Sequence, residues 1–175
     1  TGGYDRIASV GMFEHVGLKH LGAYFRKLDA LLADDGVVLN HGITAAHPDN
    51  RVVGMGVGKF IDKYVFPDGE LPHISLVLCE MSAAGFEVAD VESLRRHYAR
   101  TCEHWAEKIE RNRTEAVRIA GEKRYRIWSI YLAGCAFGFA QNWMNIYHVL
   151  AVKAHRPNPL PPTRDWIYRP AAKLS

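Results

Sequence analysis

A carboxylate beside an imidazole, close to the start of the chain, is the first candidate for chemistry. Glu14 and His15 stand in SVGMFEHVG, after the apolar run Ile7–Val10 and a glycine. A carboxylate at this place can face a ligand, or it can stabilise the start of the next helix through the helix dipole. The residue types by themselves leave these two interpretations equally open.

Two further polar side chains accompany apolar patterns later in the chain. His41 closes the apolar segment Gly36–His41, and Tyr98 begins a stripe of apolar residues at helical spacing. Each has a plain alternative to a role in chemistry. His41 can be a strand-end histidine bonded to the backbone, and Tyr98 can be a core residue. The residues alone favour these alternatives.

Nine histidines and a glycine cluster raise two other kinds of site. His97 and His104 could share one face of a helix, but no HExxH motif or cysteine pair accompanies them, so we expect no metal site. The pentad GMGVG, which contains Gly54, Gly56 and Gly58, follows no predicted strand and is a weak phosphate-binding signal. We interpret it as a hinge beside a lid.

The segments around Glu14 and His41 have the pattern of a strand–helix–strand unit. Apolar runs predict strands at Tyr4–Val10 and Gly36–His41, and apolar residues spaced by three and four predict a helix over Leu18–Leu32. Such a unit requires two parallel strands joined by a crossover. Because open α/β sheets bind ligands at the carboxyl ends of their strands, we expect Glu14 and His41 on one rim.

The remaining pattern completes an α/β domain over residues 1–155. It consists of a lid-like insertion at about 44–84, a strand, a helical insertion at about 98–146 and a last strand, and an irregular tail follows at 156–175. This order is typical of the carboxyl-terminal half of a doubly wound, Rossmann-like sheet. Individual elements are expected at Lys59–Val65, Ser75–Ala84, Phe86–Val91, Glu122–Tyr147 and Tyr147–Lys153.

Composition narrows the class of protein. The 175 residues are 48% hydrophobic, and the net charge of +3 is too mild for a nucleic-acid binder, which would show a basic stripe. Cys79, Cys102 and Cys135 are far apart, so we expect neither a disulfide scaffold nor a zinc site, and a cytoplasmic location fits. The longest apolar run, 127–140, is too short to span a bilayer.

Four motifs, in this order, resemble those of the cyclopropane-fatty-acyl-phospholipid synthase family. They are YDRIASVGMFEHVG, GVVLNHGI, FIDKYVFPDGELP and RRHYARTCEHW, and the resemblance extends from Tyr4 to about Lys153. It implies the class I fold of S-adenosylmethionine-dependent methyltransferases. It also implies transfer of a methylene group to the cis double bond of a phospholipid acyl chain, with loss of a proton as the ring closes.

The resemblance also assigns candidate site residues. The family holds a bicarbonate ion, thought to take that proton, in a dry site where electrostatic interactions are strong. The catalytic and bicarbonate-binding positions carried over by motif are Glu14, His41, Tyr98 and, through its backbone, Ile43. The cofactor-binding positions are Val10, Gly11 and His15.

Some parts of the family pattern have no counterpart in these 175 residues. They are the glycine-rich cofactor loop, the acidic residue that binds the ribose and a cysteine of the bicarbonate site. We expect them upstream of residue 1, and we expect the chain by itself to bind S-adenosylmethionine weakly. The strand edge left unpaired in such a part predicts that the chain forms a homodimer, aggregates or is accompanied by the missing half.

The expected partners are phospholipid acyl chains, which would lie along the apolar segment 127–140. Basic residues predict peripheral contact at the inner membrane surface. These are Arg95, Arg96, Arg100 and the basic residues from Arg111 to Arg126. Two alternatives stay open: a related lipid or small-molecule methyltransferase that does not close a ring, and a degenerate, non-catalytic lipid-binding protein.

Overall fold

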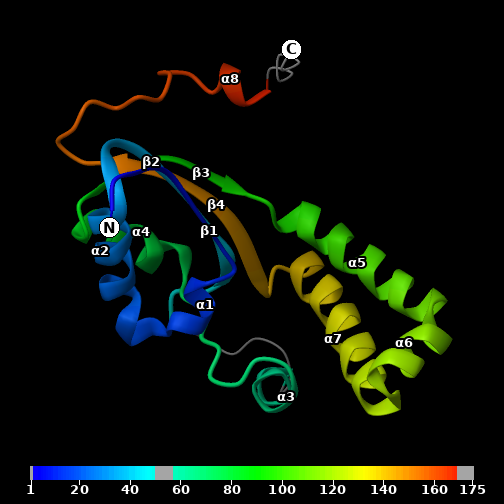
Figure 1. The fold of residues 1–175 in the computed structure, drawn as a ribbon. Coiled ribbons are helices and arrows are strands. Elements are labelled where there is room, and N and C mark those ends of the chain that lie inside the picture. The colour runs from blue at the N-terminus through cyan, green and yellow to red at the C-terminus, as the bar shows by residue number, and fades with distance from the viewer. Residues whose placement is uncertain (1, 50–56, 169–175) are drawn as a thin grey trace.

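A computed structural model describes residues 2–49 and 57–168, which form a sheet module and a helical hairpin (Figure 1). Gly54 and Gly56 of the glycine pentad lie outside the described residues. The strands of the sheet module are β1 (Tyr4–Val10), β2 (Leu32–Ala45), β3 (Phe86–Ser93) and β4 (Met144–Lys153). Its helices are α1 (Phe13–Val16), the 3-10 turn η1 (Leu18–His20), α2 (Leu21–Leu31) and α4 (Ile74–Ala83). The helical hairpin consists of α5 (Arg95–Arg111), α6 (Arg113–Ala120) and α7 (Glu122–Ala140), and the short helices α3 (Val57–Tyr64) and α8 (Asp165–Tyr168) lie outside both parts.

The four strands form one sheet in the order β1-β2-β4-β3. β1 and β2 are parallel, and Val10 at the end of β1 is level with His41. The strand–helix–strand unit predicted from the sequence is therefore confirmed. β4 is antiparallel to both β2 and β3. The chain leaves β3, turns back through the helical hairpin and re-enters the sheet as β4 in the opposite direction. Among the described residues, β1 pairs with β2 alone.

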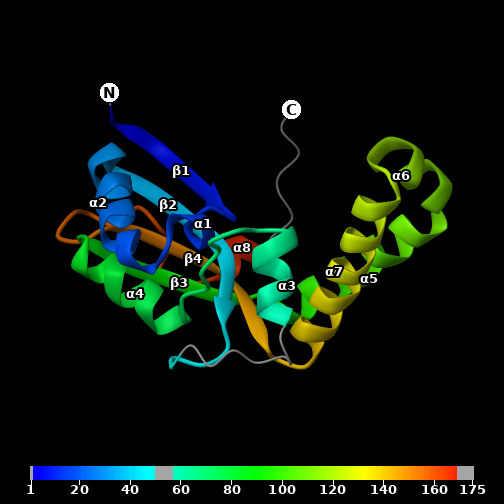
Figure 2. The same cartoon turned by 90° about the horizontal axis from the view of Figure 1, so that it is seen from below.

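The main core lies on the face of the sheet that α2 and α4 cover (Figure 2). Leu21 and Phe25 of α2 are fully buried, as their spacing of four residues on one helix face predicts. They pack with Val38 of β2 and with Val77 and Met81 of α4. The second half of the segment interpreted as lid-like, 44–84, thus contributes a core helix.

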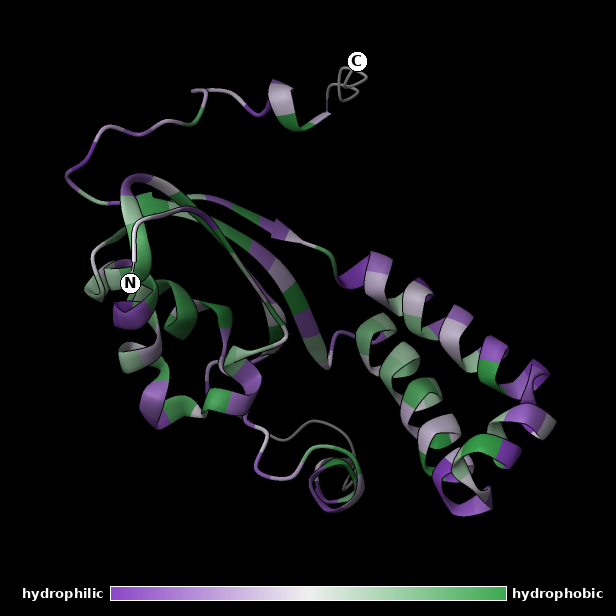
Figure 3. Cartoon of the chain, in the orientation of Figure 1, coloured by the Kyte–Doolittle hydropathy of each residue, from purple (hydrophilic) through white to green (hydrophobic). Residues whose placement is uncertain are grey.

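The helical hairpin extends beyond the ends of β3 and β4 and has a smaller core of its own (Figure 1). That core contains Cys102, Cys135 and Phe139, together with Ile146 of β4. Arg95 fastens the start of α5 to the end of α7, since it donates to the carbonyl oxygens of Phe139 (2.5 Å) and Ala140 (3.1 Å). Figure 3 shows that α5 is largely hydrophilic, whereas α7 carries more hydrophobic residues.

The boundary between the hairpin and the last strand differs from the prediction. The helix expected to continue to Tyr147 ends at Ala140, and β4 begins at Met144. Asn142 has φ +57°, a left-handed conformation that ends helices and that asparagine tolerates better than most residues. In the aromatic-rich residues that follow, the backbone N–H and C=O groups pair with the end of β2. Local sequence does not reveal this pairing, because the two strands are far apart along the chain.

The tail expected to be irregular follows the sheet edge and contains one helical turn, α8. Arg164 forms an ion pair with Asp90 of β3 at 2.8 Å, and Asn158 donates to Glu87 at 3.2 Å. These contacts attach the tail to β3, on the side of the sheet away from the end of β1 (Figure 1).

Candidate active site

Glu14 is a buried carboxylate held against the backbone of the neighbouring strand. Gly11 has φ +61°, so the chain turns sharply after β1 and enters the one-turn helix α1. The turn brings Glu14, only 8% exposed, to β2, where its Oε1 accepts a hydrogen bond from the backbone N–H of Ile43 at 2.6 Å. Glu14 is therefore a buried carboxylate bonded to a neighbouring strand, and its role as a site residue stays a prediction.

A glycine makes this approach sterically feasible. A Cβ at Gly42 would lie 2.3 Å from Phe13 Cε1 and 3.0 Å from Glu14 Oε1. Side chains alternate between the two faces of a strand, so position 42 faces α1 while His41 and Ile43 project from the other face. The absence of a side chain at Gly42 thus leaves the space that Phe13 and Glu14 occupy.

The second carboxylate oxygen of Glu14 has no protein partner. Oε2 is buried without a hydrogen bond within residues 2–49 and 57–168. Burial raises the pKa of Glu14, and the hydrogen bond from Ile43 opposes that rise only in part. The carboxyl group is therefore suited to share or hold a proton.

His41 lies inside β2 rather than at its end, which corrects the prediction for this residue. β2 continues to Ala45, but His41 is level with the last residue of β1, so it still lies at the rim of the parallel pair. Its ring meets that of His148, the residue opposite it on β4, at a centroid distance of 4.6 Å. It is 6.1 Å from the ring of Tyr98.

The surroundings of His41 favour the neutral imidazole. Burial lowers its pKa, the neighbouring His148 lowers it further, and the backbone of Tyr147 opposes this. His41 Nδ1 is buried and has no hydrogen-bond partner in the described part of the chain. The free ring nitrogen of a neutral imidazole can accept or donate one hydrogen bond, depending on the tautomer.

Tyr98 is brought into the same neighbourhood by α5. Its ring packs against Phe139 at 5.3 Å and Trp105 at 6.1 Å, and it belongs to the cluster that Ile43 joins. Burial raises the pKa of the Tyr98 hydroxyl, and the charge of Glu14 adds to the rise. Ile43 thus lies between two sets of candidate residues: its N–H contacts Glu14, and it packs in the cluster with Tyr98, whose ring is near that of His41. The binding of bicarbonate by these residues stays a prediction.

The expected cofactor positions lie on an open surface at the end of β1. The side chain of Val10 is 66% exposed, and a Cβ at Gly11 would meet no atom within 4 Å. His15 is also exposed and packs its ring edge-on against Phe66 at 5.3 Å. This surface can form one wall of a nucleotide crevice, and binding by these three residues stays a prediction.

Two supports of the site were not identified from the sequence. Glu70 in FPDGELP donates its N–H to the carbonyl of Glu14 (3.0 Å), and its Oε2 accepts from the N–H of Leu18 (2.8 Å). The motif is visible in the sequence, but its contact with α1 joins residues far apart along the chain, which no local pattern predicts. His148 lies in a strand of ordinary pattern, and only the register of β4 against β2 places it beside His41.

The donor set fits an oxyanion that carries a proton. Glu14 Oε2 can accept from its hydroxyl group, and His41 Nδ1 can bind an oxygen, because both atoms are buried without partners in the described residues.

Within the described residues there is no group of three His, Cys, Asp or Glu side chains that could hold a metal ion. No helix among them is long and apolar enough to cross a membrane.

Comparison with known proteins identifies the family. The family described as mycolic acid cyclopropane synthetase matches residues 1–149. A "probable fatty acid methyltransferase" of Pseudomonas putida is 51% identical over 170 residues, which cover 96% of this chain and 43% of the relative. The chain spans about half the length of the curated relatives it matches.

Solved structures have the same fold. The cyclopropane synthase MmaA2 from Mycobacterium tuberculosis superposes with a TM-score of 0.81 at 32% identity, over 87% of this chain and 56% of that one. Mycolic acid cyclopropane synthase CmaA1, complexed with SAH and CTAB, superposes with a TM-score of 0.80 at 36% identity and the same coverage.

Proposed function

The chain belongs to the mycolic acid cyclopropane synthetase family, and from this we propose that its complete gene product is an S-adenosylmethionine-dependent lipid methyltransferase. The substrate in this proposal is the cis double bond of a phospholipid acyl chain, to which a methylene group is transferred. The observation that carries it is that two buried atoms near the rim of the parallel strands, Glu14 Oε2 and His41 Nδ1, each lack a hydrogen-bond partner among the described residues.

When bound, S-adenosylmethionine supplies an electrophilic methyl group and bicarbonate supplies a nearby base. Glu14, His41 and Tyr98 would hold the bicarbonate, and Val10 and Gly11 would line the cofactor. A neutral His41 and a neutral Tyr98 put no positive charge beside an acyl chain on which positive charge develops. Glu14 Oε2 would accept a hydrogen bond from the hydroxyl group of the anion, while the N–H of Ile43 holds the other oxygen.

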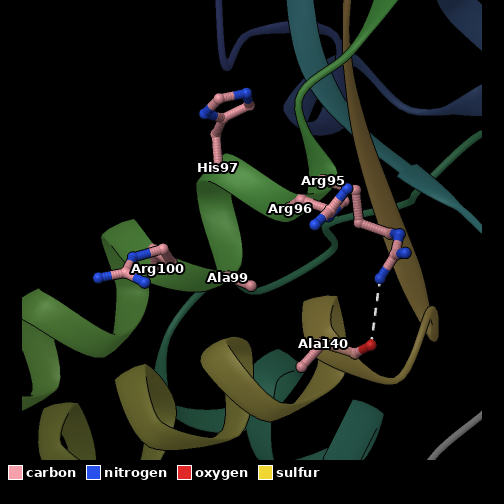
Figure 4. Close-up of a pocket in the computed structure, with 6 residues that line it drawn as sticks. All are labelled: Arg95, Arg96, His97, Ala99, Arg100 and Ala140. Carbon is pink, nitrogen blue, oxygen red and sulfur yellow. Dashed lines mark hydrogen bonds between the residues drawn. The ribbon is translucent and has the colours of Figure 1, made fainter.

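The helical hairpin supplies the observation that favours a phosphate-bearing lipid. A surface cavity of about 830 Å³ opens at the start of α5, within one turn of Tyr98 (Figure 4). The residues that line it are Arg95, Arg96, His97, Ala99, Arg100 and Ala140. The first turn of α5 carries no acidic residue, so cationic side chains stand at the positive end of the helix dipole. Arg95 is held by the carbonyl oxygens of Phe139 and Ala140, so Arg96 and Arg100 are the side chains that an anionic headgroup would meet here. Helix N-termini bind phosphate readily.

The charge distribution supports contact of the hairpin with an anionic membrane surface. Residues 95–140 contain ten Lys and Arg and five Glu, whereas the rest of the chain contains 12 Lys and Arg and 14 Asp and Glu. Exposed aromatic and aliphatic side chains, Trp105, Trp128, Ile130 and Phe137 among them, lie on the same hairpin. Basic residues next to exposed aromatic ones are typical of membrane-surface contacts.

Lipid mass spectrometry tests the proposal. The complete gene product is incubated with S-adenosylmethionine and vesicles of an unsaturated phospholipid, and the acyl chains are analysed. A gain of one CH₂ with loss of the double bond indicates ring closure, whereas the same gain with a double bond retained indicates a branched alkene, as a related methyltransferase would form. If neither product forms but the vesicles are bound, the protein is a non-catalytic lipid binder and the proposal is wrong. Glu14→Gln is assayed beside the wild type, and we expect it to form much less product.

A further inference from the structure

Beneath the candidate site lies a buried polar cluster that the proposed reaction does not use. Its members are Ser9 of β1, Tyr24 of α2 and Asn40 of β2, with exposures of 7%, 8% and 1%. Buried polar groups are costly unless they are hydrogen-bonded, so three of them in the main core require an explanation.

The hydroxyl of Tyr24 joins the other two side chains. Its oxygen lies 2.6 Å from Ser9 Oγ and 2.9 Å from Asn40 Oδ1. A tyrosine hydroxyl has one hydrogen, so Tyr24 donates to the Asn40 carbonyl and accepts from the Ser9 hydroxyl. Ser9 and Asn40 are directly opposite in the register of β1 and β2, and the crossover helix is therefore fastened to both strands at one level.

That level lies one residue before the site on each strand. Val10 and His41 follow directly, and there Gly11 N–H donates to His41 O at 2.8 Å. From Gly11 the chain turns into α1, which brings Glu14 to the N–H of Ile43. The spacing of the two strand ends therefore decides whether Glu14 reaches β2.

We infer that Tyr24 is a positioning residue, whose hydroxyl fixes the carboxyl ends of β1 and β2 relative to each other and so holds Glu14 against Ile43. The charge of Glu14 also reaches Tyr24, where it adds to the effect of burial in raising the pKa of the phenol. The part of the inference that concerns turnover rests on the proposed function. The part that concerns the strand ends does not.

Tyr24→Phe in the complete gene product is the primary test. It keeps the ring, which packs edge-on against Phe25 at 4.8 Å, and removes both hydrogen bonds. We expect kcat to fall by about 10- to 100-fold with little change in KM, since a misplacement of about 1 Å costs up to about 100-fold. Hydrogen exchange at the amides of Gly11 and Ile43 should become faster.

The matched control is Tyr125→Phe in the helical hairpin. Tyr125 is also buried, and its hydroxyl donates to Glu110 Oε2 at 2.6 Å, the same length as the bond to Ser9. This variant loses a comparable hydrogen bond far from the strand ends. We expect normal kcat and unchanged exchange at Gly11 and Ile43.

A triple variant, Ser9→Ala with Tyr24→Phe and Asn40→Leu, separates positioning from stability. Replacing all partners by apolar groups removes the unpaired polar atoms, so the Tm should recover towards wild type. If Tyr24 positions the site, kcat stays low. Recovery of kcat together with Tm, or unchanged exchange at Gly11 and Ile43 in Tyr24→Phe, overturns the inference. Failure of the wild-type protein to transfer a methyl group refutes the proposed function alone, because the exchange experiment still tests Tyr24.

Discussion

The sheet module and the helical hairpin contribute to the candidate site by opposite means. In the sheet module, Glu14 and His41 are buried, and they are placed by strand register, a close glycine contact and backbone hydrogen bonds. In the hairpin, Tyr98 lies over a small cluster, and most charged residues are exposed. The sheet module therefore holds the two buried groups whose positions strand register decides, while Tyr98, whose pKa burial also raises, stands on the hairpin.

The charged residues on the surface of the hairpin are exposed to solvent, and their ion pairs are weak. Its ion pairs, such as Arg111 with Glu107 and Arg126 with Glu122, link residues four apart on a single helix and contribute little to stability. The arginines at the start of α5 are not neutralised by acidic residues in their own helical turn. Under the proposed function, the sheet module would determine the chemistry and the hairpin would contact the lipid surface.

Removing the charge of Glu14 should have the largest effect. Glu14→Gln keeps the size of the side chain and an oxygen for the N–H of Ile43, but it cannot take a proton from a bound anion. We expect kcat to fall by about 100- to 10,000-fold, the usual range for a group that handles a proton. The exposed Glu103→Gln on α5 is the control, and its turnover should be normal. Activity of Glu14→Gln close to wild type would show that burial at this site is only structural.

A pair of glycine variants tests the packing of the two parts. Gly42→Ala forces a methyl group against Phe13 and should cost about 1–3 kcal/mol of stability, with loss of activity. Gly134→Ala in α7 meets no atom within 4 Å and should stabilise the helix by up to about 1 kcal/mol. Thermal unfolding measures both. If the two variants changed the Tm equally, the sheet module would not be more closely packed at Gly42 than the hairpin is at Gly134.

Lipid binding should depend on the hairpin. We expect Arg96→Gln with Arg100→Gln to weaken binding to vesicles that contain phosphatidylglycerol by about 30-fold at low salt, from about 1 kcal/mol per charge. Lys19→Gln with Lys27→Gln removes two exposed charges from the sheet module and serves as the control. Co-sedimentation at rising salt measures the effect. If the lysine variant lost more vesicle binding than the arginine variant, the sheet module rather than the hairpin would be the part that contacts the lipid.

The smallest expected effect is a pH dependence of stability. The pKa of His41 is lowered in the folded protein, so the unfolded chain takes up the proton first as the pH falls below the ordinary value of 6.5, and folding becomes less favourable. The Tm difference between wild type and His41→Gln should therefore narrow between pH 8 and pH 5. The narrowing should be weaker in a His148→Gln background, because His148 also lowers this pKa. A gap that widens in acid would contradict this sign.

Local pattern was sufficient for most elements of the sheet module. The apolar runs of β1 and β2 and the spacing in α2 identified the parallel unit, because strand and helix patterns can be read within each segment. Burial was not predicted equally well, since β1 is a largely exposed edge strand in which Ser9 is the buried residue. Local pattern failed between α7 and β4. Aromatic residues there suit either a helix or a strand, and a left-handed Asn142 and pairing with β2 decided the outcome.

Sequence by itself determined which residues are available to the site. Glu14, His41 and Tyr98 stood at the ends or starts of predicted elements, and topology placed the first two on one rim. The tertiary structure alone decided their states: which oxygen of Glu14 meets Ile43, that His148 lies beside His41, and that Tyr24 joins the two strands below them. These contacts depend on register and packing between segments distant along the chain, and pKa values follow the burial that such packing creates.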